Sequence, residues 1–291
     1  GATAGVTVNL NLTGAQNTGG AGLDTLVGIE NLTGTNFSDI LTGNGANNVL
    51  TGGNGDDTLQ GGGGNDRLFG GSGNDRLTGG TGADLLDGGA GVDTASYAGA
   101  TAGVRVTLDN GMGQATGGAG TDQLVSIENL IGSNFNDQLI SLFGGSTFNG
   151  ENGNDVISVQ DFEGTANGGA GDDELETDSG AGTFNGGAGN DRLTATHDHG
   201  STLNGGAGND RLEVSNPHGS PTLTGGAGAD TFIYSSTEGG FDQIVITDFA
   251  GAGAAIGDRI DLRPIDANGN PDDGNQAFVF GGPFTAGHLR Y

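Results

Sequence analysis

The sequence predicts an all-β fold, a parallel β-roll (β-solenoid) of glycine/aspartate nonapeptide repeats with a C-terminal β-rich cap. Three observations support this prediction. Glycine and aspartate recur with a nonapeptide period, a large apolar residue recurs in register with them, and an aromatic-rich tail breaks the period. Of the 291 residues, 65 are Gly and only 32% are hydrophobic, so the chain lacks the material for an ordinary core. The sequence contains no Cys, which excludes disulfides and thiolate metal sites.

The nonapeptides form two arrays. Five units follow one another from Gly52, reading GGNGDDTLQ, GGGGNDRLF, GGSGNDRLT, GGTGADLLD and GGAGVDTAS. In the second array, units start at Gly168, Gly186, Gly205 and Gly225, about two nonapeptide lengths apart, so one half of each double-length unit keeps the motif. Collagen is also rich in glycine, but it needs Gly at every third position and abundant Pro, and this chain has five Pro.

Each unit has a direct physical interpretation. In the first six positions, glycines adopt positive φ and let carbonyl groups point inward, while the Asp at position six adds an anionic oxygen. The last three positions form a very short strand whose middle residue, such as Leu59, Leu68, Leu77 or Leu86, points into the roll. Two units therefore make one coil of about 18 residues, and coils stack at about 4.8 Å.

This stacking predicts bound calcium. Carboxylates about 4.8 Å apart repel one another unless a cation lies between them, and hard oxygen ligands favour Ca²⁺ over softer metals. We therefore expect multiple Ca²⁺ ions. The candidate metal residues are the aspartates and the first and fourth glycines of the units, with four aspartates from the irregular segments: Asp24, Asp39, Gly52, Gly55, Asp57, Gly61, Gly64, Asp66, Gly70, Gly73, Asp75, Gly79, Gly82, Asp84, Gly88, Gly91, Asp93, Asp122, Asp137, Gly150, Gly153, Asp155, Gly168, Gly171, Asp173, Gly186, Gly189, Asp191, Gly205, Gly208, Asp210, Gly225, Gly228 and Asp230.

The period also assigns the aspartates to rows. In the tandem array, the two expected rows are Asp57, Asp75, Asp93 and Asn48, Asp66, Asp84. Because Asn48 carries no charge, its site should be the weakest of that block. In the later array a single row is expected, with calcium mostly on one edge: Asp155, Asp173, Asp191, Asp210 and Asp230.

A longer duplication overlies the nonapeptides. The segment 2–41 returns without a gap as segment 100–139, and more than half of the aligned positions are identical. Both copies contain a Val-x-Val-x-Leu alternation that predicts a half-buried strand. We divide the chain into an irregular β-roll module that starts truncated, the tandem roll, a second irregular module, a roll with calcium turns mainly on one edge, and a cap whose end is truncated: residues 1–51, 52–97, 98–149, 150–233 and 234–291.

The repeat GGxGxDxUx, in which U is a large apolar residue, resembles the calcium-binding nonapeptide of the repeats-in-toxin (RTX) proteins. The tail, with its elements ITDF, DRIDL and HLRY, is similar to the C-terminal domain of serralysins. This resemblance implies a secreted bacterial protein, exported through a type I system and folding outside the cell on binding Ca²⁺. Similar modules occur in mannuronan epimerases and large secreted adhesins, so the resemblance does not choose among hosts.

Composition and motifs narrow the function. The formal net charge of −28 makes nucleic acid an unsuitable partner, and no apolar run is long enough for membrane insertion. The sequence has no His-Glu-x-x-His motif, no Gly-x-Ser-x-Gly elbow and no Cys nucleophile, so we expect no enzymatic activity in this chain. The favoured function is a structural element of a surface layer, adhesin or filament, with self-assembly or a surface polysaccharide as open partners. The alternative is an accessory domain of an exported protease, epimerase or lipase.

Two smaller features remain open. His197, His199 and His218 lie in the variable halves of neighbouring coils and suit zinc or nickel, but we favour an incidental place in a polar loop. The tail concentrates aromatic residues, which we interpret as a covering for the last coil rather than a carbohydrate platform: Phe232, Tyr234, Phe241, Phe249, Phe278, Phe280 and Phe284.

Overall fold

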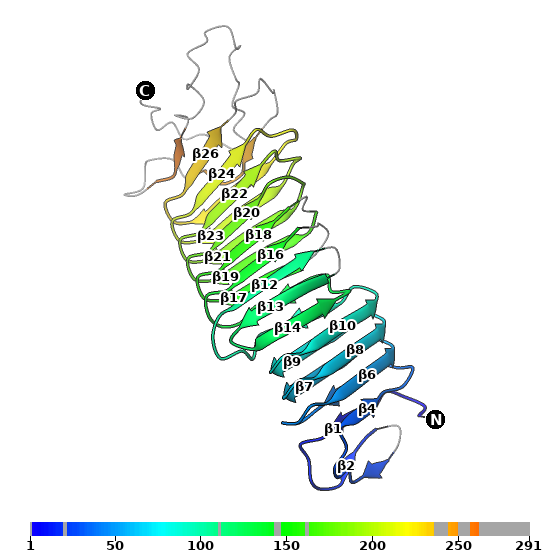
Figure 1. Ribbon diagram of the computed structural model, residues 1–291. Helices are drawn as coiled ribbons and strands as arrows, with labels where there is room; N and C mark the ends of the chain where they lie inside the picture. The colour runs from blue at the N-terminus through cyan, green and yellow to red at the C-terminus, as the bar shows by residue number, and fades with distance from the viewer. Residues whose placement is uncertain are drawn as a thin grey trace, which may run out of the picture. The chain divides into compact units, whose positions relative to one another are not determined.

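The computed structural model describes residues 2–19, 22–109, 112–142, 147–160, 163–235, 244–249 and 257–261. Every regular element in these ranges is a β-strand. The chain divides into two compact units, residues 1–140 and 141–291. In each unit, parallel strands stack as a β-solenoid, which confirms the predicted fold class (Figure 1). No helix in the described ranges is long and apolar enough to cross a membrane.

In the first unit the chain winds alternately through two sheets, whose strands are mostly parallel to their neighbours. One sheet contains β1 (Thr7–Asn9), β5 (Ile40–Thr42), β7 (Thr58–Gly63), β9 (Arg76–Thr81), β11 (Thr94–Ser96) and β15 (Asn129–Ile131). The other contains β4 (Asn31–Thr33), β6 (Val49–Asn54), β8 (Arg67–Ser72), β10 (Leu85–Ala90), β14 (Gly120–Val125), β13 (Met112–Gly117), β12 (Val104–Asp109) and β16 (Gln138–Ser141). A separate short pair is formed by β2 (Gln16–Asn17) and β3 (Leu23–Asp24).

The tandem roll has the predicted register. Strand β7 pairs with β9 so that Leu59 faces Leu77, one coil later, and β8 pairs with β10 so that Leu68 faces Leu86. All four leucines are fully buried between the two sheets. One leucine per nonapeptide is therefore the core of this roll.

The strands are longer than the three positions that the sequence predicts. Strand β7 has six residues because pairing with β9 continues through Gly62 and Gly80. Glycines have no Cβ, so neighbouring coils stay close enough to pair as the strand bends into the turn, where Gly62 has a φ of 110°. The polar turn is thus built onto the end of each strand instead of following it.

The second irregular module contains an antiparallel hairpin. Strands β12, β13 and β14 pair as a meander, and β14 then aligns in parallel with β10, with Leu124 opposite Leu86. Val104, Val106 and Leu108 of β12 are buried, as the alternation predicts. The hairpin is thus an insertion, after which the chain resumes the roll.

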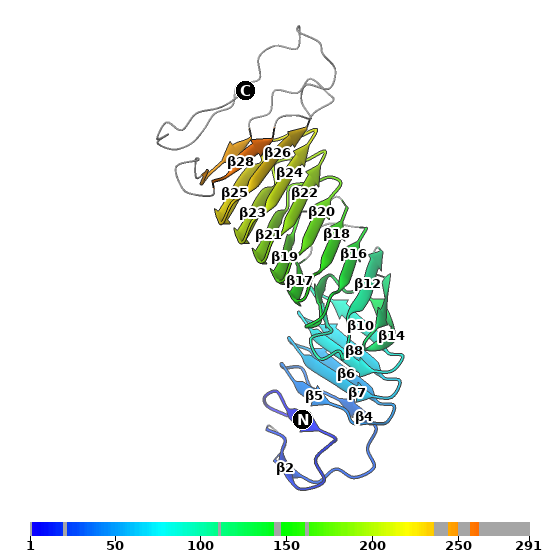
Figure 2. The ribbon, with the colours of Figure 1, turned by 90° about the vertical axis from the view of Figure 1, so that its left-hand side faces the viewer.

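The second unit repeats the two-sheet design (Figure 2). One sheet contains β17 (Thr147–Asn152), β19 (Thr165–Ala170), β21 (Thr183–Ala188), β23 (Thr202–Ala207), β25 (Thr222–Ala227) and β27 (Val245–Ile246). The other contains β18 (Val156–Val159), β20 (Glu174–Thr177), β22 (Arg192–Thr196), β24 (Arg211–Ser215), β26 (Thr231–Ser235) and β28 (Arg259–Asp261). Along the first sheet, Asn side chains hydrogen-bond from coil to coil, from Asn167 to Asn149 and from Asn185 to Asn167.

Aromatic residues enter the core towards the tail. Phe232 and Tyr234 of β26 are buried, and the rings of Phe232 and Phe249 lie 6.3 Å apart. Strands β27 and β28 continue the two sheets beyond the last nonapeptide. Phe241, Phe278, Phe280 and Phe284, which the sequence assigns to the cap, lie outside the described residues.

Candidate metal sites in the glycine-aspartate turns

The turns require glycine for a steric reason. At Gly73, φ is 135°, and a Cβ atom there would collide with the carbonyl oxygen of Gly55, one coil earlier. An L-residue at this position would suffer both backbone strain and a backbone clash. The glycine pattern therefore lets turns of successive coils stack directly on one another.

The aspartates at position six form three hydrogen-bonded rows. In each row, the Oδ1 atom of one Asp accepts a hydrogen bond from the backbone N–H of the row member one coil earlier, at 2.7 to 3.0 Å. Row 1 is Asp39, Asp57, Asp75, Asp93. Row 2 is Asn48, Asp66, Asp84, Asp122. Row 3 is Asp155, Asp173, Asp191, Asp210, Asp230, Asp258. The alignment predicted for the tandem and later arrays is therefore present.

The second carboxylate oxygen has no hydrogen-bond partner in most row members. These Oδ2 atoms are buried and unpaired in Asp57, Asp66, Asp75, Asp84, Asp93, Asp122, Asp173, Asp191, Asp210 and Asp230. A buried carboxylate oxygen without a partner is costly, so a repeated row of them points to a ligand that is not part of the chain.

A backbone oxygen lies near the unpaired oxygen in several units. A Cβ atom on Gly52 would collide with Oδ2 of Asp57 and lie 2.7 Å from the carbonyl oxygen of Gly70. A Cβ atom on Gly168 would likewise meet Oδ2 of Asp173 and the carbonyl oxygen of Gly186. The first glycine of a unit therefore leaves room for a carboxylate oxygen and a carbonyl oxygen from the next coil to converge.

Burial also perturbs the protonation of the rows. Loss of solvation, reinforced by neighbouring aspartates, raises the pKa of Asp57 to about 6 and that of Asp173 to about 7. The hydrogen bond that each carboxylate accepts from the backbone opposes this increase in pKa. The folded rows thus hold negative charge in an environment that disfavours it.

These features fit Ca²⁺. Unpaired anionic oxygens, nearby carbonyl oxygens and a net charge of −28 match a hard divalent cation that takes six to eight oxygen ligands. The described ranges contain no group of three or more His, Asp or Glu side chains that could hold a metal ion. Each site would therefore draw one or two carboxylates from a row and its other ligands from the backbone.

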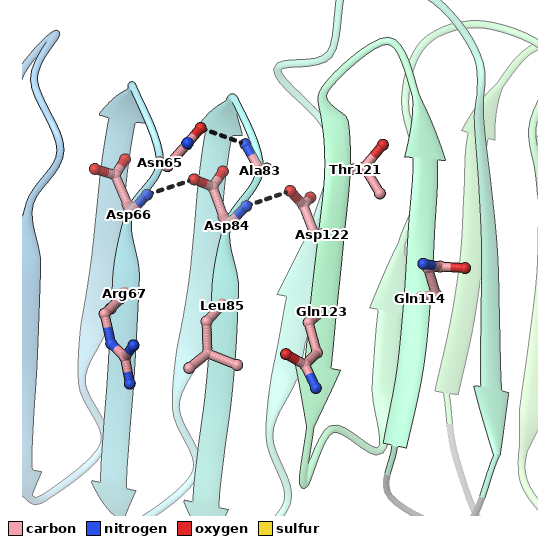
Figure 3. A pocket seen from close by; sticks show the side chains of 10 residues that line it. All are labelled: Asn65, Asp66, Arg67, Ala83, Asp84, Leu85, Gln114, Thr121, Asp122 and Gln123. Carbon is pink, nitrogen blue, oxygen red and sulfur yellow. Dashed lines mark hydrogen bonds between the residues drawn. The ribbon is translucent and has the colours of Figure 1, made fainter.

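Row 2 continues through the hairpin insertion. Figure 3 shows Asp66, Asp84 and Asp122 side by side on successive coils, joined by the hydrogen bonds of the row. They line a 590 Å³ pocket together with the position-five and position-seven side chains and Gln114 of β13. Residues 117–125, GGAGTDQLV, are a further nonapeptide whose turn stacks on residues 79–84 through the Gly82–Gly120 bridge.

Sequence reasoning named Asp122 but missed Gly117 and Gly120 of that unit. The motif GGxGxDxUx was visible, but its place inside an irregular duplicated segment concealed it. Reasoning also missed Glu128, whose Oε2 accepts the N–H of Asp93 and extends row 1 with a longer side chain. No nonapeptide surrounds Glu128, so only the stacking reveals it.

Three predicted ligands have a different environment. Asp39 accepts hydrogen bonds from Val6 and Thr35, and Asp137 accepts the equivalent bonds from Val104 and Ser133. Both oxygens of each carboxylate therefore already have protein partners. Asp24 is only half-buried, and its Oδ2 accepts a hydrogen bond from Thr18. Their assignment as metal ligands stays a prediction without the feature that supports the other row members.

The histidines meet on the surface of the second unit. The rings of His199 and His218 lie 5.8 Å apart, edge to face, and those of His197 and His218 lie 6.4 Å apart, so the histidines of neighbouring coils lie close together. All three side chains are exposed. Within the described residues, the three histidines do not belong to a cluster of side chains that could hold a metal ion. We therefore keep the interpretation that they lie in a polar loop.

Two family models match overlapping parts of the chain. The model of the RTX calcium-binding nonapeptide repeat, in four copies, matches residues 33–68 and 60–95. The model of the peptidase M10 serralysin C-terminal domain matches residues 83–285, more than half of the chain. A search of curated proteins found no significant match. Both predicted resemblances are confirmed, and Ca²⁺ is the metal that repeats of this type bind.

Proposed function

The chain belongs to the family of peptidase M10 serralysin C-terminal domains and carries RTX repeats, and from this premise we propose that it folds on binding extracellular Ca²⁺ as a structural element of a secreted protein. RTX and serralysin-type domains are typical of proteins secreted through type I systems. In this role the chain is unfolded where calcium is scarce and becomes a stiff rod outside the cell. The host structure would be a surface layer, an adhesin or a filament.

The observation that carries this proposal is the set of unpaired Oδ2 atoms. These oxygens lie buried along three rows, and each belongs to the Asp of a glycine-aspartate turn. Without a cation, each would oppose folding through desolvation and repulsion from its neighbours. With Ca²⁺, the same oxygens become ligands, and metal binding becomes folding free energy.

The proposal is tested by titrating calcium into the chelated chain and recording far-ultraviolet circular dichroism. We expect a largely disordered chain that gains β structure at roughly millimolar Ca²⁺, the range of weak extracellular modules. Mg²⁺ at equal ionic strength should produce little folding, because it demands octahedral geometry at shorter distances. Full β structure in excess chelator, or full folding in Mg²⁺ alone, would contradict the proposal.

A second candidate is favoured by the serralysin match. Because that family describes domains that accompany a peptidase, this chain could serve as the accessory domain of an exported protease, epimerase or lipase. Only repeat and C-terminal family models match the chain, which is consistent with a module that has no activity itself.

The two candidates differ in self-association. A structural element should assemble end to end or along its length when Ca²⁺ is added, whereas an accessory domain should remain monomeric at every calcium concentration. Light scattering at matched protein concentrations, with and without Ca²⁺, separates them. A calcium-folded but strictly monomeric chain would favour the accessory role.

A further inference from the structure

The two copies of the irregular module fold differently despite their similar sequences. In the second copy, β12, β13 and β14 are six-residue strands that pair along their whole length. In the first copy, the corresponding hairpin shrinks to the two-residue strands β2 and β3. The strands that precede Gly22 and Gly120 differ at many positions, but residues 22–33 and 120–131 are identical at eight of twelve. The difference between these two segments must therefore come mainly from what surrounds each copy.

The second copy, unlike the first, packs against a preceding nonapeptide roll. Strand β14 pairs with β10, and β15 pairs with β11, so residues 120–131 lie directly on the coil of residues 79–97. Backbone bonds reinforce the contact, from Gln123 N–H to the Asp84 carbonyl and from Asn129 N–H to the Asp93 carbonyl. In the first copy, β4 is the end strand of its sheet and pairs only with β6 among the described strands.

Burial of matching apolar residues shows the same contrast. Ile127 is 3% exposed, but Ile29, its counterpart in the first copy, is 39% exposed. Leu124 is fully buried, whereas its counterpart Leu26 is only half-buried. Val27 is 78% exposed. An apolar strip of this kind, on a glycine-rich chain with few residues for a core, marks a contact surface.

The contrast is confined to this strip. Phe37 and Phe135 are also counterparts, and both are 45% exposed. They lie in the loop before the last strand of each module, which faces solvent in both copies. Exposure therefore rises in the first copy only where the second copy contacts the roll.

We propose that residues 22–33 form a docking surface for the end of a nonapeptide roll, a coil of the same kind as residues 79–97, in a repeating unit equivalent to residues 2–99. The residues that contact the roll in the second copy are retained in the first, because Asp24, Leu26, Ile29, Glu30 and Leu32 match Asp122, Leu124, Ile127, Glu128 and Leu130. The docked coil orders the hairpin, buries the strip and extends both rows of turns into the module.

The charges at the two edges of the docking surface also fit a nonapeptide coil. A nonapeptide coil presents Asp at both edges, as Asp84 and Asp93 do to Asp122 and Glu128. Asp24 and Glu30 would take those places in the first copy, so docking would be stable only with Ca²⁺ between the turns. An unrelated apolar partner would leave these acidic groups without a counter-ion.

The test uses a chain in which residues 2–99 are duplicated directly ahead of Ala2, compared with the present chain at a Ca²⁺ concentration that protects residues 52–97 from hydrogen exchange. Protection of residues 52–97 shows that the roll has folded on calcium. A failure of calcium-dependent folding can therefore be distinguished from a failure of docking. We expect exchange at residues 22–33 to slow at least tenfold in the longer chain, approaching that of residues 120–131. The loop around Phe37 should exchange equally in both chains.

A matched pair of substitutions provides a second readout. In the present chain, Ile127→Ala should lower the midpoint of denaturant unfolding and Ile29→Ala should not. In the duplicated chain both should lower it. The proposal is overturned if Ile29→Ala leaves the unfolding midpoint of the duplicated chain unchanged, or if exchange at residues 22–33 is the same in both chains. It is also overturned if the added roll is unprotected from exchange while residues 52–97 are protected. Protection that appears in the present chain only at high protein concentration would assign the surface to a second copy instead and would equally overturn it.

Discussion

The backbone N–H of Asp57 donates a hydrogen bond of 2.8 Å to Oδ1 of Asp75, one coil later, while Oδ2 of Asp75 is buried without a partner. One oxygen of the Asp75 carboxylate thus ties two coils together, and the other remains for a cation. The same division of roles recurs in members of all three rows, whereas Asp39 of row 1 has protein partners for both oxygens.

Substitution of Asp75 should weaken more than one site. Asp75 has row neighbours on both sides, Asp57 and Asp93, so Asp75→Asn removes a charge from two stacked positions. We expect a clearly higher calcium midpoint for folding, on the order of several-fold, because each coil is stabilised mainly by its neighbours. The measurement is circular dichroism during a calcium titration.

The matched control for this substitution is Asp109→Asn. Asp109 is exposed at the end of β12 and outside the rows, so its substitution changes net charge equally. Equal midpoints for the two variants would mean that calcium acts by general screening and not at the turns.

Acid should partly replace calcium in stabilising the fold. Burial raises the pKa of Asp57, Asp66 and Asp93 to about 6 and that of Asp122 to about 7. The folded chain therefore binds more protons than the unfolded chain between about pH 4 and pH 7. Stability of the calcium-free roll should rise as pH falls through this window and decline as pH rises through it.

Calcium binding should show the opposite dependence, because protons compete for the same oxygens. We expect the calcium midpoint to increase as pH falls from 7.5 to 5.5, while the chelated chain gains β structure. Added salt at pH 7.5 serves as the control for screening. A chelated chain with less β structure at pH 5 than at pH 8 would show that the row pKa values are not raised.

Replacing a glycine in the turns should lower the stability of the fold more than replacing a glycine elsewhere. Gly73→Ala places a Cβ against the Gly55 carbonyl at a φ of 135°, so it should lower the free energy of unfolding by about 2 kcal/mol or more. Gly99→Ala is the control, because a Cβ there meets nothing within 4 Å. Denaturant unfolding in saturating Ca²⁺ measures both, and comparable losses would contradict the steric explanation.

The single leucine of each nonapeptide should carry most of the apolar stability. Leu68 is fully buried, and Leu68→Ala should cost about 2 to 5 kcal/mol. Leu23 is 76% exposed, so Leu23→Ala should change the free energy of unfolding by no more than about 0.5 kcal/mol. The comparison is made by chemical unfolding at fixed Ca²⁺, and a small loss at Leu68 would indicate that bound calcium alone holds the coils together.

The nonapeptide period determined the roll, the inward leucines and the rows, because a solenoid turns a sequence period directly into a spatial stack. Asp57, Asp75 and Asp93 could be aligned from their spacing alone, and Leu59 and Leu77 could be placed inside for the same reason. Where the period is interrupted, sequence distance no longer gives position. The pairing of Asp84 with Asp122 depends on a hairpin that leaves the roll and returns to it.

Tertiary structure alone decided which carboxylates remain unpaired. Asp39 belongs to row 1 and Asp137 is its counterpart in the second module, yet neighbouring Thr35 and Ser133 donate to their oxygens, while Asp75 keeps one oxygen free. It also decided that Glu128 completes row 1 and that Ile29 and Ile127 differ in burial despite similar local sequence. Hydrogen-bond partners and burial depend on the coils stacked on either side, and a repeat sequence specifies its own coil but not what covers it.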